Sequence, residues 1–179
     1  SVVFGLLLAA TQVTLEPHIK QNDILIFNQQ AAILLPEATQ FEPVEDVTIQ
    51  DSTGAAQKIN VIKANSLGGP QGWIFVVQGS GFADVIRLVV AVDAPFEKVR
   101  GFRVLASNET PGFGDKIKDD FYQSQYKGAP VGQFELVKTG DSGKIDHEIV
   151  AITGATVTSQ AVVDMMNAYI VPVREQLAQ

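Results

Sequence analysis

The chain has 179 residues, 46% of them hydrophobic, which is enough for one well-packed domain and too few for two ordinary ones. Its formal net charge of -7 at pH 7, with no lysine or arginine cluster to offset it, argues against nucleic acid as a partner. The lack of cysteine excludes iron–sulfur ligation, thiolate zinc sites and disulfides, and two histidines do not support a multi-histidine metal site. If electrons pass through this chain, an organic cofactor must hold them.

An uncharged apolar run, Val2 to Ala10, opens the chain. It is shorter than the roughly 20 residues that a helix needs to span a bilayer, and a core helix would also explain it. Because the chain begins inside the run, without a start methionine or a basic region, we expect the outer half of a transmembrane anchor helix. This predicts an anchor remnant at residues 1–15 and an extracytoplasmic domain at residues 16–179.

The next elements are predicted from apolar spacing and from turn residues. A helix is expected from Gln21 to Leu35, and short antiparallel strands are expected near residues 47–49 and 59–62. Segments rich in Val, Ile and Phe predict three consecutive strands of a meander, at residues 73–78, 85–93 and 101–105. The second of these is apolar almost throughout, which indicates that both faces of the sheet are covered.

The second half of the chain predicts further helices around this sheet. A turn rich in glycine and proline at residues 108–115 leads into a short amphipathic helix at residues 116–126. A polar hairpin follows, with residues 134–137 as one arm and residues 140–143 as its turn. A short apolar segment at residues 149–152 precedes a last helix at residues 160–170. The fold class is therefore α+β, with an antiparallel sheet flanked by helices.

The candidate chemistry lies in Thr153 to Ser159, TGATVTS, between an apolar segment and the last helix. The glycine and alanine of this segment leave the backbone open to a bulky group, and Thr158 or Ser159 can cap the helix. The unpaired N–H groups and the positive end of the helix dipole would then favour a phosphate at the Thr156 hydroxyl. A plain helix cap after a glycine turn explains the same residues, so the segment alone leaves both interpretations open.

Two motifs in order resemble one known family. TGATVTS resembles the S/T-G-A-T attachment motif of the FMN-binding domain that the G subunit of the Rnf complex shares with the C subunit of the sodium-translocating NADH:quinone reductase. Residues 108–117, NETPGFGDKI, are similar to the E-T-P-G-L/F-G segment upstream of it in that family. The meander is similar too, although Ala83 stands where a further glycine is often found. The resemblance covers about residues 73–169, and the Asp115-Lys116 ending favours the Rnf G subunit.

The resemblance implies that FMN is bound covalently, by a phosphoester to Thr156. It implies no catalytic residue and no metal ligand, because the flavin supplies the chemistry. The other residues that it places around the cofactor are Thr153, Gly154, Ala155, Thr158, Glu109, Thr110, Gly112, Phe113 and Gly114.

The implied role is electron relay in a membrane-bound, ion-translocating redox complex of the Rnf type, without substrate turnover by the chain alone. The implied partners are the other subunits of that complex, the flavin transferase that attaches FMN, and the membrane through the N-terminal helix. The implied location is the inner membrane, with a single pass and the domain on the periplasmic side.

One position departs from the family pattern. The flavin transferase of this family usually meets an aspartate three residues before the S/T-G-A-T start, where this chain has Val150. Asp146 lies four residues further back and is out of register. Two alternatives therefore remain open. FMN is attached covalently with weaker recognition by the transferase, or it is bound without a covalent bond.

Two other functions compete with the relay. A substrate-binding or carbohydrate-binding module would use Trp73 as a stacking platform, although a single tryptophan in an apolar strand is more often a core residue. A stand-alone FMN-dependent reductase would oxidise NAD(P)H, but the sequence has no G-x-G-x-x-G fingerprint for a nucleotide phosphate.

Overall fold

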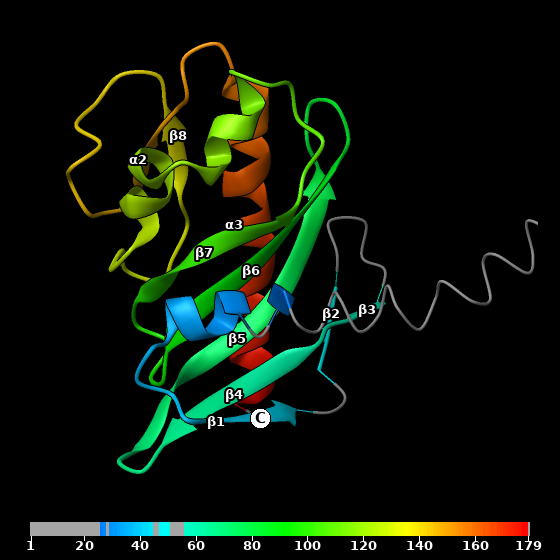
Figure 1. Cartoon of the computed structure of the whole chain (residues 1–179), viewed down its shortest axis with the longest axis vertical. Coiled ribbons are helices and arrows are strands. Elements are labelled where there is room, and N and C mark those ends of the chain that lie inside the picture. Colours follow the sequence, from blue (N-terminus) through cyan, green and yellow to red (C-terminus); the bar gives the residue numbers. More distant parts are fainter. Residues whose placement is uncertain (1–25, 28, 45–46, 51–55, 179) are drawn as a thin grey trace, which may run out of the picture.

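The computed structural model describes residues 26–27, 29–44, 47–50 and 56–178 (Figure 1). The predicted anchor remnant, residues 1–15, and the start of the predicted domain lie outside this range. Within the described residues, no helix is both long enough and apolar enough to cross a membrane.

A five-stranded antiparallel sheet forms the centre of the domain, with strand order β1-β4-β5-β6-β7 (Figure 1). The predicted meander is confirmed; β6 has the predicted bounds, and β5 and β7 are longer than expected. The turn before β5 contains only two residues, Leu67 and Gly68. The strands are β1 (Gln40–Val44), β4 (Val61–Ser66), β5 (Gly69–Ser80), β6 (Val85–Asp93) and β7 (Val99–Ala106).

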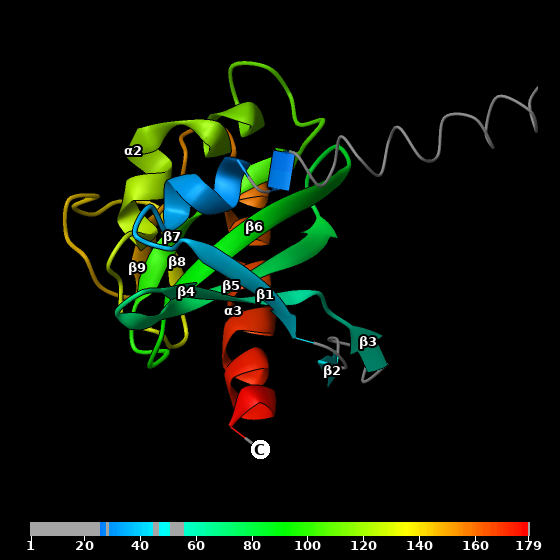
Figure 2. The same cartoon turned by 60° about the horizontal axis from the view of Figure 1, so that its bottom comes forward.

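Helices cover both faces of this sheet, as the apolar sequence of β6 predicted. The long helix α3 (Thr156–Leu177) packs on one face, and the helical residues 26–27 and 29–34 lie on the other (Figures 1 and 2). The buried side chains of β6 alternate accordingly: Leu88 and Val90 join the cluster with α3, and Val89 and Ala91 join the cluster with the N-terminal helix. The fold is thus α+β.

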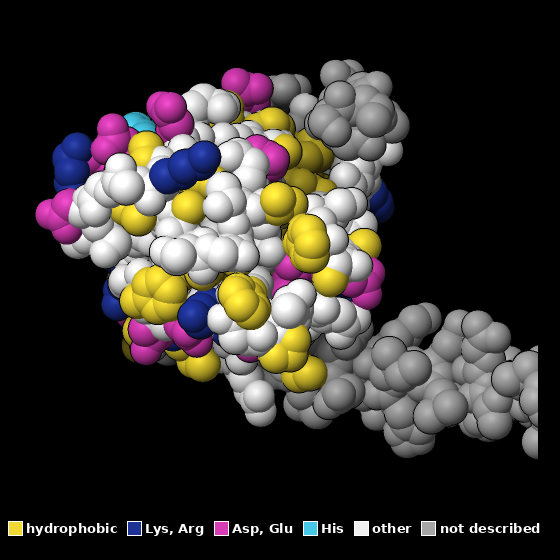
Figure 3. All heavy atoms as spheres, turned by 90° about the horizontal axis from the view of Figure 1, so that it is seen from above, with side chains coloured by type: hydrophobic (Ala, Val, Ile, Leu, Met, Phe, Trp, Pro, Cys, Tyr) yellow, Lys and Arg dark blue, Asp and Glu magenta, His cyan; other side chains and the backbone are white. Residues whose placement is uncertain are grey.

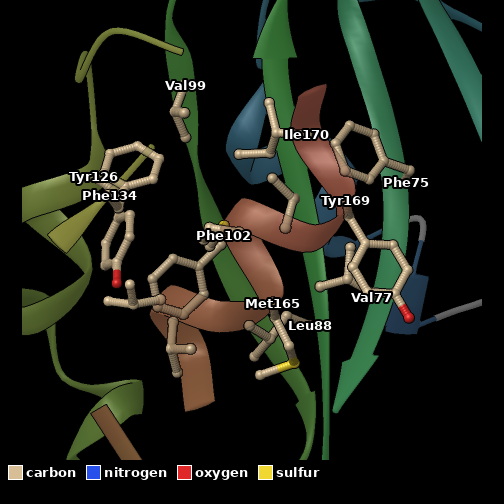
Figure 4. Packing of buried hydrophobic residues seen from close by; sticks show 14 of the residues in the cluster. Phe75, Val77, Leu88, Val99, Phe102, Tyr126, Phe134, Met165, Tyr169 and Ile170 are labelled. Carbon is tan, nitrogen blue, oxygen red and sulfur yellow. The ribbon is translucent and has the colours of Figure 1, made fainter. Parts of the chain in front are cut away.

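The larger hydrophobic cluster lies between α3 and the sheet. Met165, Tyr169 and Ile170 of α3 face Phe75, Val77 and Leu88 of the strands (Figure 4). Gly79 lets the helix approach β5 closely, since a Cβ atom at this position would lie 2.7 Å from Cγ of Met165. α3 is longer at both ends than the predicted helix at residues 160–170, and its first residue is Thr156.

Two predictions in the second half were wrong in detail. The helix expected at residues 116–126 consists of three short pieces, because Asp119 is extended at φ -77° and ψ 144°. The expected hairpin does not form: β8 pairs with β9 in parallel, so that Glu135 N–H donates to the His147 carbonyl at 2.8 Å. Burial of Ile149 at the centre of β9 favours this non-local pairing. The pieces are η1 (Gly114–Lys118), α2 (Asp120–Gln123), η2 (Ser124–Tyr126), β8 (Glu135–Val137) and β9 (Glu148–Val150).

A second small sheet lies beside the C-terminal half of α3 (Figure 1). Its antiparallel strands are β2 (Thr48–Gln50) and β3 (Ala56–Lys58). The hydroxyl group of Tyr169 donates to Oε1 of Gln57 in β3 and to the carbonyl of Gln78 in β5, each at 3.1 Å. These bonds tie the small sheet and the central sheet to the same helix.

Candidate functional site

A pocket of about 430 Å³ opens at the end of the molecule where α3 begins. Three segments that are distant in sequence line it: the β5–β6 loop, the loop that precedes η1, and the junction of β9 with α3. Of the ten residues predicted for the site, all except Thr153 and Gly112 line this pocket, and Phe82 and Val157 join them. The lining residues are Phe82, Glu109, Thr110, Phe113, Gly114, Gly154, Ala155, Thr156, Val157 and Thr158.

The start of α3 presents the Thr156 hydroxyl at the rim of this pocket. Thr156 is the first residue of the helix and is exposed, and Ala155 precedes it in a non-helical conformation at φ -135° and ψ 41°. The predicted cap by Thr158 or Ser159 is wrong, because no side chain caps α3. The N–H groups of the first turn therefore have no side-chain acceptor, and this end of a 22-residue helix favours an anion.

The hydroxyl of Ser159 joins the strand end to the helix instead of capping it. It accepts a hydrogen bond from Ile152 N–H at 3.0 Å and donates to the Ala155 carbonyl at 2.9 Å. Ser159 is fully buried, and its own carbonyl accepts a hydrogen bond from the hydroxyl of Tyr122 at 3.1 Å. These bonds hold the turn at residues 152–155 against the first turn of α3.

Gly154 allows this turn to lie against Phe113. It adopts φ +81°, a region that favours glycine, and a Cβ atom there would lie 2.9 Å from Cδ1 of Phe113. The TGATVTS segment and the segment before η1 are thus in contact across the pocket, although 41 positions separate Phe113 from Gly154.

Glu109 lies at the wall of the pocket and is only 5% exposed. Its Oε2 accepts a hydrogen bond from the hydroxyl of Thr158 at 2.5 Å, and its Oε1 accepts one from Ala83 N–H at 2.9 Å. Burial by itself raises the pKa of this carboxyl group, but the hydrogen bonds from Thr158 and from the backbone of the β5–β6 loop outweigh that effect and leave the pKa below its ordinary value. The Glu109 side chain is therefore ionised at neutral pH.

Exposed apolar side chains surround the mouth of the pocket. Phe82, Phe113 and Val157 are 68%, 52% and 57% exposed. Figure 3 looks onto this end of the molecule and shows hydrophobic side chains exposed over it, with basic and acidic side chains between them. The sequence motifs did not indicate Phe82 or Val157 as site residues. The sequence did offer a signal for each residue. Phe82 is an aromatic residue within a glycine turn, and Val157 is an apolar residue between two threonines at a helix start.

The remaining predicted residues lie outside the pocket. Thr153 and Gly112 are exposed turn residues next to it, and Gly112 adopts φ +78° with open space around it. Trp73, the stacking platform of the binding-module alternative, is half-buried in β5. Its ring packs 5.8 Å from that of Phe96, and its indole N–H donates to the Ala94 carbonyl at 3.1 Å. Trp73 is therefore held by the sheet.

The site as a whole can hold a small, partly apolar molecule that bears an anionic group. The pocket has the size of a small-molecule site, apolar side chains at its mouth, and a hydroxyl group beside the unpaired N–H groups of a long helix. Among its lining residues there is no lysine, arginine or histidine. The anion would therefore be stabilised by backbone N–H groups and the helix dipole.

Comparisons with known proteins identify the family. The family model of the FMN-binding domain matches residues 81–171. The G subunit of an ion-translocating oxidoreductase complex from Methanosarcina acetivorans is 31% identical over 94% of this chain and 86% of its own length. The G subunit of a proton-translocating ferredoxin:NAD(+) oxidoreductase complex from Clostridium ljungdahlii is 31% identical over 89% of this chain and 78% of its own.

A solved structure has the same fold. The crystal structure of NqrC from Shewanella oneidensis superposes with a TM-score of 0.62 and 25% sequence identity, over 80% of this chain and 73% of that one. The region that the family model matches contains the β5–β6 loop, the segment before η1 and the start of α3, which together form the pocket. The chain therefore belongs to the FMN-binding domain family, as the two sequence motifs predicted.

Proposed function

We propose that this chain is an electron-relay subunit of a membrane-bound, ion-translocating redox complex of the Rnf type, and that it carries FMN esterified through its phosphate to Thr156. The observation that carries the proposal is the meeting of the two motifs in one pocket at the start of α3. The names of the relatives, which are G subunits of ion-translocating oxidoreductase complexes, support the assignment to such a complex.

The residues of the pocket fit FMN. The Thr156 hydroxyl lies at the N-terminus of α3, where the backbone N–H groups of the first turn favour the charge of a phosphate. Phe82, Phe113 and Val157 offer apolar surface to a flavin ring, and Gly154 keeps the backbone free of a side chain beside the attachment point. FMN bound there supplies the capacity to accept and release electrons.

The chain's own residues bind, orient and shield the cofactor. The Ser159 hydroxyl fixes the turn that precedes Thr156, and Phe113 covers Gly154. None of these roles requires a general base, because electron transfer at a held cofactor needs position and electrostatics from the protein. A covalent bond to Thr156 would also keep the cofactor in an exposed site.

Val150, which replaces the usual aspartate of the transferase signal, is part of β9. Its backbone N–H donates to Oε1 of Gln125 at 2.7 Å. This bond holds β9 in place and does not involve the side chain at position 150. We propose that the transferase acts on this chain in spite of the replacement, because Thr156 remains exposed. Non-covalent FMN in the same pocket is the alternative outcome of the test.

We further propose that residues 1–15 belong to a single membrane-spanning anchor and that the domain lies on the periplasmic side of the inner membrane. The motivation is the uncharged apolar run Val2 to Ala10 followed by polar residues. Protease added to spheroplasts should then cleave the domain. Full protection before lysis would overturn this topology.

Intact mass after co-expression with a flavin transferase tests the attachment. The wild-type chain should gain the mass of one FMN and remain fluorescent after denaturation, because a phosphoester does not depend on the fold. Thr156→Ala should lose both signals. Thr139→Ala is the matched control, since Thr139 is exposed and lies outside both the pocket and the TGAT segment.

Four outcomes are distinguishable. Loss of the covalent mass in Thr156→Ala alone supports the proposal, and flavin that the wild type releases on unfolding indicates non-covalent FMN. Wild-type protein without any flavin refutes the cofactor assignment. Rapid NADH oxidation by the chain without its partners would favour the stand-alone reductase instead.

A further inference from the structure

Glu109 connects the three segments that form the pocket. It belongs to the segment before η1, and its carboxylate bonds to Ala83 in the β5–β6 loop and to Thr158 in the first turn of α3. Thr158 lies 49 positions further along the chain. A single side chain thus joins two loops to the helix that carries Thr156.

The surroundings of Glu109 are shaped to accept its carboxylate. A Cβ atom at Gly81 would lie 2.3 Å from its Oε1, and a Cβ atom at Gly114 would lie 2.7 Å from its Oε2. Neither glycine has positive φ, so close packing is what requires a glycine at both positions: against Glu109 at each, and also against Ile86 and Asp84 at Gly81 and against Thr158 at Gly114. The carboxylate is therefore enclosed on two sides by bare backbone.

The charge of Glu109 is stabilised by neutral groups. Its hydrogen-bond donors are the Thr158 hydroxyl and backbone N–H groups of residues 82–84. Within the part of the chain that the structure describes, no lysine, arginine or histidine forms an ion pair with it. A negative charge at the pocket wall, without a cation beside it, is not cancelled by an opposite charge and opposes further negative charge in the pocket.

We propose that Glu109 is a positioning residue of the flavin site: its carboxylate holds the β5–β6 loop and the first turn of α3 together, and its negative charge lowers the reduction potential of the flavin in this pocket. The proposal rests on the proposed function. Reduction adds negative charge to a flavin, and a fixed anion nearby opposes that addition.

Substitution by glutamine separates the charge from the contacts. In Glu109→Gln, the amide oxygen can accept from Ala83 N–H while the amide nitrogen donates to the Thr158 hydroxyl, so the segments stay joined. We expect a higher midpoint potential than in the wild type, measured on the fraction of Glu109→Gln that carries flavin on Thr156. Glu135→Gln, which removes an exposed carboxylate from β8, is the control and should leave the potential unchanged.

Substitution by aspartate keeps the charge and shortens the side chain. Glu109→Asp cannot reach both Ala83 and Thr158, so we expect faster amide hydrogen exchange at Ala83 than in the wild type, while the potential of any attached flavin does not rise. The amide measurement is made on flavin-free protein and is therefore independent of the proposed function. It also carries the test if Glu109→Gln does not fold.

Each result bears on a separate part of the inference. Wild-type protein that never carries flavin refutes the proposed function and leaves the amide measurement standing. A flavin-loaded Glu109→Gln variant with the wild-type potential overturns the electrostatic part. Unchanged exchange at Ala83 in Glu109→Asp overturns the positioning part.

Discussion

Gly154 and Gly112 have similar positive φ angles in different surroundings. Their φ angles are +81° and +78°, but a Cβ atom at Gly154 would meet the Phe113 ring, and one at Gly112 would meet nothing within 4 Å. Gly112→Ala should therefore lower the free energy of unfolding by about 1 kcal/mol through backbone strain alone. Gly154→Ala should cost more, because the ring must also move.

Urea denaturation of the two alanine variants measures this difference. FMN attachment, read as intact mass, should fall in Gly154→Ala and persist in Gly112→Ala, since only the first displaces a residue that lines the pocket. Equal losses of unfolding free energy in the two variants would mean that the Phe113 ring moves without energetic cost and does not fix the turn before Thr156.

The pH dependence of stability should report the ionised Glu109. Its pKa in the folded state is below the ordinary value of 4.5, so its contribution to stability is present above that pH and is lost as the pH falls through the folded pKa. The difference in unfolding free energy between wild type and Glu109→Gln should therefore be constant near neutrality and shrink in acid.

Asp84 is the titrating neighbour that could obscure this result. It lies in the β5–β6 loop, to which Glu109 is hydrogen-bonded, and hydrogen bonds from Asn108 and from Val85 N–H also lower its pKa. Because Asp84 is present in both proteins, its contribution cancels in the difference. A difference that grows as the pH falls would show that the pKa of Glu109 in the folded state lies above its ordinary value.

The residues that form the pocket could be predicted better than the way they interact. Thr156, Phe113 and Gly154 follow from two local motifs. The bond between Glu109 and Thr158 spans 49 positions and has no local signal. For the same reason Thr158 was expected to cap α3, as its position near a helix start suggests, whereas its hydroxyl donates to a distant carboxylate.

At the scale of elements, the junction of β9 and α3 depends on one buried hydroxyl. Ser159→Ala would leave Ile152 N–H without its acceptor, and an unpaired buried donor costs about 1–3 kcal/mol. Chemical denaturation should show a loss in this range. Ser124→Ala, which removes an exposed hydroxyl bonded only to the nearby Phe121 carbonyl, should change stability by less than about 0.5 kcal/mol.

If Ser159→Ala loses less unfolding free energy than this range, a water molecule has replaced the hydroxyl group. In that case FMN attachment should also be unaffected, because the turn at residues 152–155 would keep its shape. If stability falls as expected, attachment should fall with it, since the same hydroxyl fixes the residue that precedes Thr156.

The elements that were predicted well are those whose pattern is local. Alternating or continuous apolar segments identified β5, β6 and β7, and the amphipathic spacing identified the middle of α3. The pairing of β8 with β9 could not be predicted, because Glu135 and Glu148 are 13 positions apart and join in parallel. The break at Asp119 was missed because polar residues around it fit a helix as well as a turn.

At the scale of the whole molecule, the sheet separates two cores of unequal size. The larger one lies on the α3 side and extends towards the pocket through Met165, which packs on Gly79 near the end of β5. The smaller one contains Leu35 and the inner face of the helix at residues 29–34. The side chains of Leu35 and Met165 are buried, so one substitution can weaken either core.

Leu35→Ala and Met165→Ala should therefore destabilise the domain to similar extents, by about 2–5 kcal/mol each, but differ in their effect on the site. Leu35 packs against Gly72 on the face of the sheet opposite α3, and no residue of its cluster lines the pocket. Met165 supports the approach of α3 to β5, and the β5–β6 loop continues directly from there to Phe82. At a temperature well below both unfolding transitions, intact mass should show full FMN attachment in Leu35→Ala and reduced attachment in Met165→Ala. Equal losses in the two variants would indicate that attachment depends on global stability, and that the two cores do not act on the site separately.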